Sequence, residues 1–222
     1  IKAKNMTDYH PGLDGVIATE SSISDIDGEK GILSYRGYSI EELAEKSTFE
    51  ETAYLLLTGE LPTKSELEVF ITKINARRDL PEGLIKLLQT LPKDSNPMDV
   101  IQLAVSSLGT FYPIEFDAEK LKANKYTTEY FIDVSAGMIG SIGSIVAAWN
   151  RIKNNKNYIK PDNKLPYAEN FMHMLDDSIK VTPLINRIID ATLILHAEHT
   201  INASTFTAMV TSSTLASPTQ VI

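Results

Sequence analysis

The 222-residue chain contains no cysteine, and this absence excludes disulfides, thiolate metal ligands and cysteine nucleophiles among these residues. Positive charge is also scarce, because 21 lysines and arginines stand against 29 acidic residues, for a formal net charge of -8. This balance argues against a partner that is nucleic acid or an anionic membrane. The basic stretch at residues 151–164 lacks a series of stacking aromatic side chains and is interpreted as a solvated loop.

Targeting and nucleotide-binding signals are missing too. Neither GxGxxG nor the Walker pattern occurs, so nucleotide binding has no support. The first twelve residues, IKAKNMTDYHPG, have neither the apolar centre of a secretory signal nor the Arg-rich pattern of a transit peptide. Together with the lack of cysteine, these features predict a cytoplasmic protein.

The longest uncharged run, residues 134–150, reads VSAGMIGSIGSIVAAWN. It is shorter than the roughly 20 apolar residues of a membrane span and is diluted by serine and asparagine, so it predicts a buried helix. Gly137, Gly140 and Gly143 recur every three residues within it. This spacing puts small residues on one helical face, where another backbone can approach closely.

A short N-terminal region has strand character, and signals for helix starts come after it. Residues 16–37 hold two apolar runs separated by DGEKG, a turn between candidate hairpin strands. Ser39, Thr48 and Thr63 each precede a Glu three residues later, which is the pattern of a capping box at a helix N-terminus. Further periodic segments predict helices at about residues 64–77, 82–91, 97–108, 167–175, 181–199 and 203–222. The sequence therefore predicts an all-α, mostly helical fold with a small N-terminal β-hairpin element.

Two of the four histidines, His196 and His199, lie three residues apart after the apolar run IIDATLIL. On a helix they would share one face. Buried histidines bonded to backbone carbonyls are one interpretation. A metal site lacks a second pair of suitably spaced ligands, and Ser204 lacks a glycine elbow and a third catalytic group. Together with Asn202, the two histidines form a set of donors suited to a small carboxylate or keto acid.

Three segments, in order, resemble the citrate synthases of the bacterial and archaeal type. They are residues 12–63, which begin GLDGVIATESS, residues 165–175, LPYAENFMHML, and residues 193–206, LILHAEHTINASTF. The resemblance implies a mostly helical fold with a large and a small domain, working as a homodimer or higher homo-oligomer with active sites between the domains. Residues 1–222 are then expected to form the N-terminal part of the large domain, with their end approaching the small domain.

The resemblance also implies a reaction, the one that brings acetyl groups into the tricarboxylic acid cycle. An aspartate takes a proton from the methyl group of acetyl-CoA, and a histidine stabilises the enol. The enol attacks the carbonyl of oxaloacetate, and hydrolysis of the thioester gives citrate and CoA. Acetyl-CoA and oxaloacetate are the implied partners, and no cofactor is implied.

Site residues follow from the matched motif. His199 matches the family's oxaloacetate-binding histidine, and it is expected to donate a hydrogen bond to the dicarboxylate and hold it for attack. His196 is expected to be a supporting residue. Asn202 occupies the family's asparagine position and is expected to hold the substrate or cap the next helix.

The family's catalytic groups have no match in residues 1–222. These groups are a histidine in a Gly-Pro-Leu-His-Gly loop, a second histidine, the catalytic aspartate and the substrate-binding arginines, and neither His10 nor His173 fits their positions. We therefore expect the catalytic residues beyond Ile222, in a native chain that continues, and we expect this stretch alone to be inactive.

Two alternatives remain open. A 2-methylcitrate synthase, which uses propionyl-CoA, resembles the sequence in the same motifs, and these residues do not line the acyl pocket well enough to decide. The second alternative is a truncated, non-catalytic helical assembly protein, in which residues 134–150 and the apolar last segment are interfaces.

Overall fold

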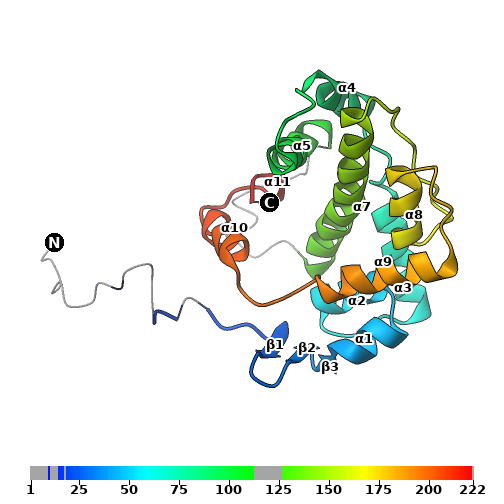
Figure 1. The fold of residues 1–222 in the computed structure, drawn as a ribbon. Coiled ribbons are helices and arrows are strands. Elements are labelled where there is room, and N and C mark those ends of the chain that lie inside the picture. Colours follow the sequence, from blue (N-terminus) through cyan, green and yellow to red (C-terminus); the bar gives the residue numbers. More distant parts are fainter. Residues whose placement is uncertain (1–9, 11–14, 18, 113–126, 222) are drawn as a thin grey trace, which may run out of the picture.

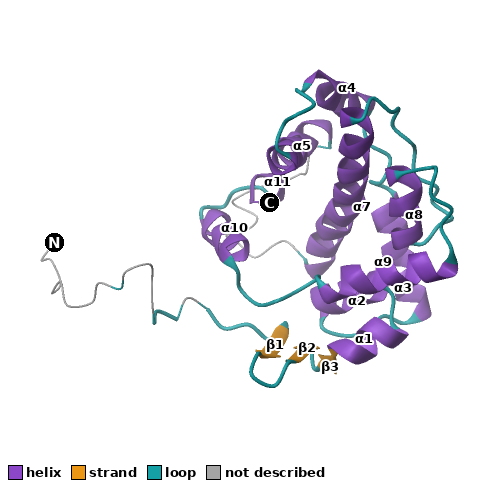
Figure 2. Cartoon of the chain, viewed as in Figure 1, coloured by secondary structure: helices purple, strands orange, loops and turns teal. Residues whose placement is uncertain are grey.

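The computed structural model describes residue 10 and residues 15–17, 19–112 and 127–221. Three short strands come first and helices follow, as Figure 1 shows by colour and Figure 2 by type of element. The strands are β1 (Ser24–Asp27), β2 (Ile32–Tyr35) and β3 (Tyr38–Ser39). The helices are α1 (Ile40–Lys46), α2 (Phe49–Thr58), α3 (Lys64–Asn75), α4 (Glu82–Thr90), α5 (Pro97–Phe111), α7 (Thr128–Lys153), α8 (Tyr167–Leu175), α9 (Pro183–Leu195), α10 (Ala203–Ser213) and α11 (Pro218–Val221). The predicted all-α fold with a small N-terminal β element is confirmed.

The strands form one antiparallel sheet in the order β1-β2-β3. Ser24 pairs with Tyr35 across β1 and β2, and the predicted turn DGEKG joins these two strands. Gly31 ends this turn with a φ of +66°, a left-handed conformation that glycine adopts without steric cost. The sequence did not predict β3, because a strand of two residues, Tyr38–Ser39, carries no alternation pattern.

Of the three predicted capping boxes, those that begin α2 and α3 form, whereas α1 has only the N-cap bond. At Thr48 and at Thr63 the hydroxyl accepts the N–H of the Glu three residues on, whose carboxylate accepts the N–H of the cap in return. At Ser39 only the first bond forms, with the N–H of Glu42 as donor. The Glu42 carboxylate instead pairs with Lys46 one turn later, at 3.1 Å. Helix starts that depend on neighbouring residues were therefore predicted correctly.

The long helix α7 runs through the middle of the molecule and packs against α3, α5 and α8 (Figure 1). A Cβ at Gly140 would lie 2.2 Å from the carbonyl oxygen of Ile74, so the close backbone approach predicted for this glycine face takes place against α3. By length and composition α7 could cross a membrane. However, its buried residues, such as Ala136, Ile145 and Trp149, lie in the core between these helices, as the buried-helix prediction expected.

The interpretation of residues 151–164 as a solvated loop is wrong at its start. Arg151 belongs to α7 and is only 6% exposed. Its guanidinium donates to Asp177 at 2.9 Å and to the carbonyl of Asn157, so the buried charge has partners. Lys160 lies on the surface and pairs with Asp79 at 3.3 Å.

Two further helices, α5 and the predicted C-terminal helix, also differ from prediction. α5 continues to Phe111, about one turn past the predicted end. The helix predicted over residues 203–222 is two helices, because the chain turns at Leu215, whose φ is +65°, before Pro218 starts α11. None of the residues of α10 is buried.

Candidate functional site

The predicted histidine pair does not lie on a helical face. α9 ends at Leu195, His196 is its C-cap, and His199 lies in the turn that leads to α10. The helix predicted over residues 181–199 is therefore too long at its C-terminal end. His196, His199 and Asn202 are all exposed, and they lie within one short segment, which we call the histidine turn (residues 196–202).

His196 closes α9 with its own ring. Its Nδ1 lies 2.8 Å from the carbonyl oxygen of Thr192, so Nδ1 donates to this carbonyl and Nε2 is left for other partners. The backbone N–H of His196 reaches the same oxygen at 3.2 Å. Carbonyls in the last helical turn lack intrahelical donors. His196 supplies two donors, its ring Nδ1–H and its backbone N–H, to the carbonyl of Thr192.

Asn202 links the histidine turn to α10 and to His199. Its Oδ1 accepts the N–H of Thr205 at 2.7 Å, which makes Asn202 the N-cap of α10 and confirms one of its two predicted tasks. With Oδ1 occupied in this way, the amide Nδ2 faces Nε2 of His199 at 3.3 Å. Since an amide NH₂ only donates, Nε2 is the acceptor and the neutral ring carries its proton on Nδ1.

Thr200, one of the two residues between His199 and Asn202, has a left-handed φ of +74°. A β-branched side chain rarely adopts this conformation, which costs on the order of 1–3 kcal/mol and persists only where surrounding contacts hold it. Here the N–H of Thr200 donates to the Glu198 carboxylate, and its carbonyl accepts the N–H of Asn202 at 3.1 Å. The backbone on both sides of the turn is thus fixed.

Sequence reasoning missed the contacts of Tyr35, which bonds the backbone of this turn, and of Glu198, which belongs to the turn. The Tyr35 hydroxyl lies 2.9 Å from the carbonyl oxygen of Glu198 and 3.1 Å from that of Ile194. The Glu198 carboxylate accepts a hydrogen bond from the hydroxyl of Ser24 at 3.1 Å. No local signal could have revealed these contacts, because they join positions 159 to 174 residues apart in the chain.

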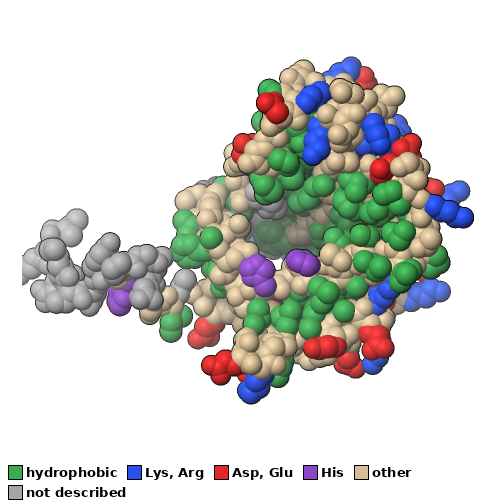
Figure 3. Space-filling view, viewed as in Figure 1, with side chains coloured by type: hydrophobic (Ala, Val, Ile, Leu, Met, Phe, Trp, Pro, Cys, Tyr) green, Lys and Arg blue, Asp and Glu red, His purple; other side chains and the backbone are tan. Residues whose placement is uncertain are grey.

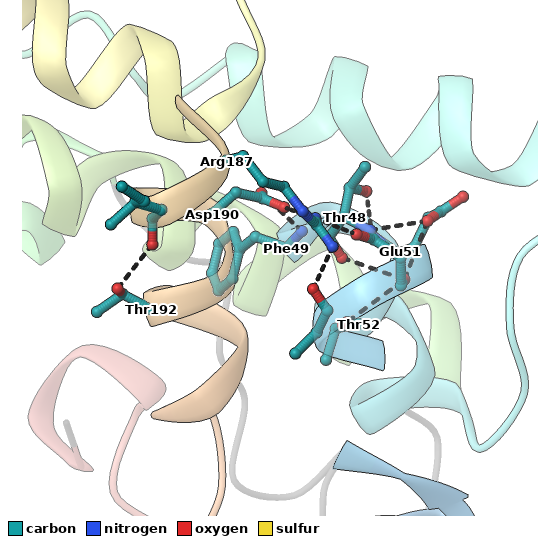
Figure 4. Close-up of polar contacts among 10 residues, drawn as sticks. Thr48, Phe49, Glu51, Thr52, Arg187, Asp190 and Thr192 are labelled. Carbon is teal, nitrogen blue, oxygen red and sulfur yellow. Dashed lines mark hydrogen bonds and ion pairs between the residues drawn. The ribbon is translucent and has the colours of Figure 1, made fainter. Parts of the chain in front are cut away.

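A polar cluster docks α9 onto α1 and α2 (Figure 4). The guanidinium of Arg187 donates to the carbonyls of Ser47, at 2.9 Å, and Ala44. It also donates to the Asp190 carboxylate at 3.2 Å, whose other oxygen accepts the N–H of Phe49 at 3.0 Å. Burial raises the pKa of Asp190, and the Phe49 N–H and Arg187 counteract this effect. The cluster fixes the helix that ends in the histidine turn.

Figure 3 shows a hollow in this face of the molecule, with hydrophobic side chains around it and histidines at its rim. Exposed apolar side chains of the adjoining helices include Leu184, Ile188 and Leu195 on α9 and Val210 on α10. Among the described residues, no group of three or more histidines and carboxylates could hold a metal ion. The histidines therefore offer hydrogen-bonding groups at the rim of a hollow that has hydrophobic side chains around it.

Comparison with known proteins gives consistent matches over nearly the whole chain. The family model "Citrate synthase, C-terminal domain" matches residues 12–222. The citrate synthase of Acidithiobacillus ferridurans is 43% identical over 214 residues, which are 96% of this chain and 54% of that protein. The 2-methylcitrate synthase 1 of Corynebacterium glutamicum is 39% identical over 209 residues, which are 91% of this chain and 52% of that protein.

Solved structures agree with this result. The crystal structure of citrate synthase from Pyrobaculum aerophilum matches with a TM-score of 0.87 and 38% identity, covering 95% of this chain and 52% of that one. The citrate synthase from Thermotoga maritima matches with a TM-score of 0.77 and 37% identity over the same shares. The chain spans about half the length of the curated relatives it matches.

Proposed function

Since this chain belongs to the citrate synthase family, we propose that the whole protein condenses acetyl-CoA with oxaloacetate to give citrate and CoA. Its class of chemistry is acyl transfer, at the step that brings acetyl groups into the tricarboxylic acid cycle. The match over residues 12–222 carries this proposal. No resident cofactor is needed, because the thioester of acetyl-CoA already acidifies the methyl group that must lose a proton.

We propose His199 as an oxaloacetate ligand. Its Nε2 is occupied by the Asn202 amide, so its Nδ1–H is free to donate to a carboxylate or carbonyl oxygen of the substrate. His196 is proposed as a supporting residue, because its Nδ1 is already used by the Thr192 carbonyl. Asn202 is proposed to hold His199 in the correct tautomer, an orientation effect on the bound dicarboxylate.

The proposed activity is tested by release of CoA from acetyl-CoA in the whole protein, with and without oxaloacetate. Release that depends on oxaloacetate, with citrate as the product, is the expected result. A His199→Ala variant should lose on the order of 100-fold in kcat/KM, since it removes an orienting donor. An absence of oxaloacetate-dependent release with every acyl-CoA offered would refute the proposal.

A second candidate is 2-methylcitrate synthase, which the 39% identity to the Corynebacterium glutamicum protein favours. This enzyme would take propionyl-CoA, and one extra methylene in an apolar pocket is worth only about 1–3 kcal/mol, or about 10–200-fold. The ratio of kcat/KM for acetyl-CoA and propionyl-CoA therefore decides between the two candidates. A ratio above one supports citrate synthase, and a ratio below one supports 2-methylcitrate synthase.

We further propose that residues 1–222 are the N-terminal part of a large domain and supply only part of the oxaloacetate site. The share of the relatives' length that is matched supports this assignment. The catalytic groups would then lie elsewhere in the whole protein, and residues 1–222 alone should form no citrate. Citrate production by this stretch alone would overturn the assignment.

A homodimer in the cytoplasm is also proposed, and it accounts for exposed apolar side chains on α5. Met98 is 67% exposed and Leu103 is 43% exposed. Sedimentation equilibrium of the whole protein should give twice the chain mass, and Leu103→Glu should lower it toward the monomer mass. A monomeric wild-type protein would contradict this proposal.

A further inference from the structure

The three-stranded sheet lies against the end of α9 from which the chain leads to α10 (Figure 1). We propose that Tyr35, on β2 of this sheet, is a positioning residue for oxaloacetate binding, because its hydroxyl holds the histidine turn that carries His199. The inference rests on the proposed function, and it assigns to Tyr35 a task that requires no contact with substrate.

The Tyr35 ring is fixed by its surroundings. It is 0% exposed and packs in a core cluster with Leu43, Leu55 and Ile194. A side chain clamped in this way keeps its hydroxyl in one place. Burial raises the pKa of Tyr35, and a weaker opposing effect comes from its hydrogen bond with the Glu198 backbone. The hydroxyl therefore keeps its proton and remains a donor throughout the neutral range.

The hydroxyl bonds the backbone at the point where α9 gives way to the turn. It accepts the N–H of Glu198 at 3.2 Å, and it lies within donating distance of two carbonyl oxygens, those of Glu198 and Ile194. The carbonyl of Ile194 is in the last helical turn, where intrahelical donors run out. The segment has no glycine to close the helix in the usual left-handed way, so the Tyr35 hydroxyl from the sheet shares this task with the His196 ring.

The Glu198 side chain extends the same connection. Its Oε1 accepts the hydroxyl of Ser24 on β1 and the N–H of Thr200, the residue with the left-handed φ. Thr200 in turn bonds Asn202, whose amide faces His199. His199 thus lies between Glu198, which the sheet holds directly, and Thr200, which the sheet holds only through the Glu198 carboxylate. Removing these bonds should let the turn leave the conformation in which Nδ1 of His199 is aimed at the ligand.

This arrangement predicts a specific kinetic change. If the turn is ordered only a fraction of the time, the apparent affinity for oxaloacetate falls by that fraction. For Tyr35→Phe in the whole protein we expect a rise in the KM for oxaloacetate of about tenfold. The KM for the acyl-CoA and the kcat at saturating substrate should stay within about twofold of wild type, because the variant changes neither the acyl site nor the reacting groups.

Tyr167→Phe is the matched control. Tyr167 is also buried, and its hydroxyl donates to the carbonyl of Ile139 at 2.7 Å, between α8 and α7. Each variant deletes one buried, hydrogen-bonded hydroxyl and keeps the ring, so both should lower the melting temperature to a similar extent. Only Tyr35→Phe should raise the KM for oxaloacetate.

Glu198 provides a second test that leaves the core intact. Glu198→Ala removes the acceptor for Ser24 and Thr200 and should raise the KM for oxaloacetate in the same way. Glu198→Gln keeps an acceptor oxygen at that position and should restore the wild-type KM. This pair remains informative if Tyr35→Phe does not fold.

The outcomes distinguish a failure of the positioning role of Tyr35 from a failure of the proposed function. If the wild-type protein is active, two results would overturn the positioning role alone. One is an oxaloacetate KM that is unchanged from wild type in both Tyr35→Phe and Glu198→Ala. The other is an equal rise in this KM in Tyr167→Phe. Absence of wild-type turnover would overturn the proposed function and this role with it. Amide exchange at Glu198 and Thr200, which is measured without substrate, should be faster in Tyr35→Phe, and unchanged exchange would show that the hydroxyl does not hold the turn.

Discussion

At the scale of single residues, the two ends of the Asn202 amide have separable tasks. The oxygen caps α10 through the N–H of Thr205, and the nitrogen faces His199. Asn202→Ser should keep the cap, because serine serves at this position about as well as asparagine, but a shorter side chain leaves His199 without its donor. The oxaloacetate KM should rise while the unfolding free energy changes little.

Asn202→Ala is the comparison for this variant. It loses both functions, so it should raise the KM and also lower the free energy of unfolding by about 1 kcal/mol. Urea denaturation and initial-rate kinetics on the same preparations separate the two effects. If Asn202→Ser binds oxaloacetate as wild type does, the amide nitrogen has no part in the site.

A buried carboxylate, Glu50, gives a prediction in pH. Its side chain accepts the N–H of Tyr167 at 2.8 Å. Burial raises the pKa of Glu50 above its usual value of 4.5, and this effect exceeds the opposing influence of the Tyr167 N–H and of the buried Arg78. The folded state therefore binds the Glu50 proton more tightly than the unfolded state does, so this group's contribution to stability falls as pH rises through the folded pKa.

Glu50→Gln removes this titration and keeps an acceptor for the Tyr167 N–H. The unfolding free energy of wild type minus that of Glu50→Gln should therefore decrease as pH rises from about 4.5. Urea denaturation at several pH values, from acidic to neutral, measures this difference. A difference that is constant, or that increases with pH, would contradict the raised pKa.

At the scale of elements, the contact between α7 and α3 depends on Gly140. A Cβ at this position would meet backbone atoms of Ile74, which can move only if α3 moves. Gly140→Ala should lower the unfolding free energy by about 2 kcal/mol or more, even after the gain in helix propensity of about 1 kcal/mol. Gly137→Ala is the control, since its Cβ would meet only the flexible Arg77 side chain at 3.2 Å. Equal losses in both variants would refute this explanation.

The docking of α9 onto α1 and α2 depends on the hydrogen bonds of Asp190. Asp190→Ala leaves the N–H of Phe49 without an acceptor and removes one of the three acceptors of Arg187, so it should cost about 1–3 kcal/mol of unfolding free energy. Asp190→Asn keeps one acceptor oxygen for the Phe49 N–H and loses the oxygen that faces Arg187 and the charge, which burial already disfavours. The asparagine variant should therefore be the more stable of the two by chemical denaturation, and the reverse order would contradict the role of the Phe49 bond.

The elements that the sequence predicted well are those decided by near neighbours. Thr48 and Thr63 start helices through residues three positions on, and Asn202 caps α10 in the same way. The end of α9 was predicted wrongly, because contacts with Tyr35, about 160 residues earlier, help to hold the chain that leaves the helix. Periodicity and capping patterns contain no information about such a partner, so the histidine turn was mistaken for a helical face.

At the scale of the whole molecule, the recognised motif named the candidate site residues but not what holds them. His196, His199 and Asn202 were named from a short run of sequence, and they do lie in one turn. The supporting contacts come from β1, β2, α1 and α2, which belong to the first quarter of the chain. Their roles could be assigned only after the fold brought both ends of the sequence together.

The lack of buried residues in α10 has a consequence for local opening. Amides of α7, which is packed on several sides, should exchange with solvent deuterium only through global unfolding, whereas those of α10 should exchange through brief, local openings. The histidine turn joins α9 to α10, and the hydrogen bond from the Thr205 N–H to the Asn202 side chain is the first that α10 must break to open at this end. Oxaloacetate bound at His199 should therefore reduce the local opening of α10. Deuterium uptake in α10 should slow in proportion to the occupancy of the site.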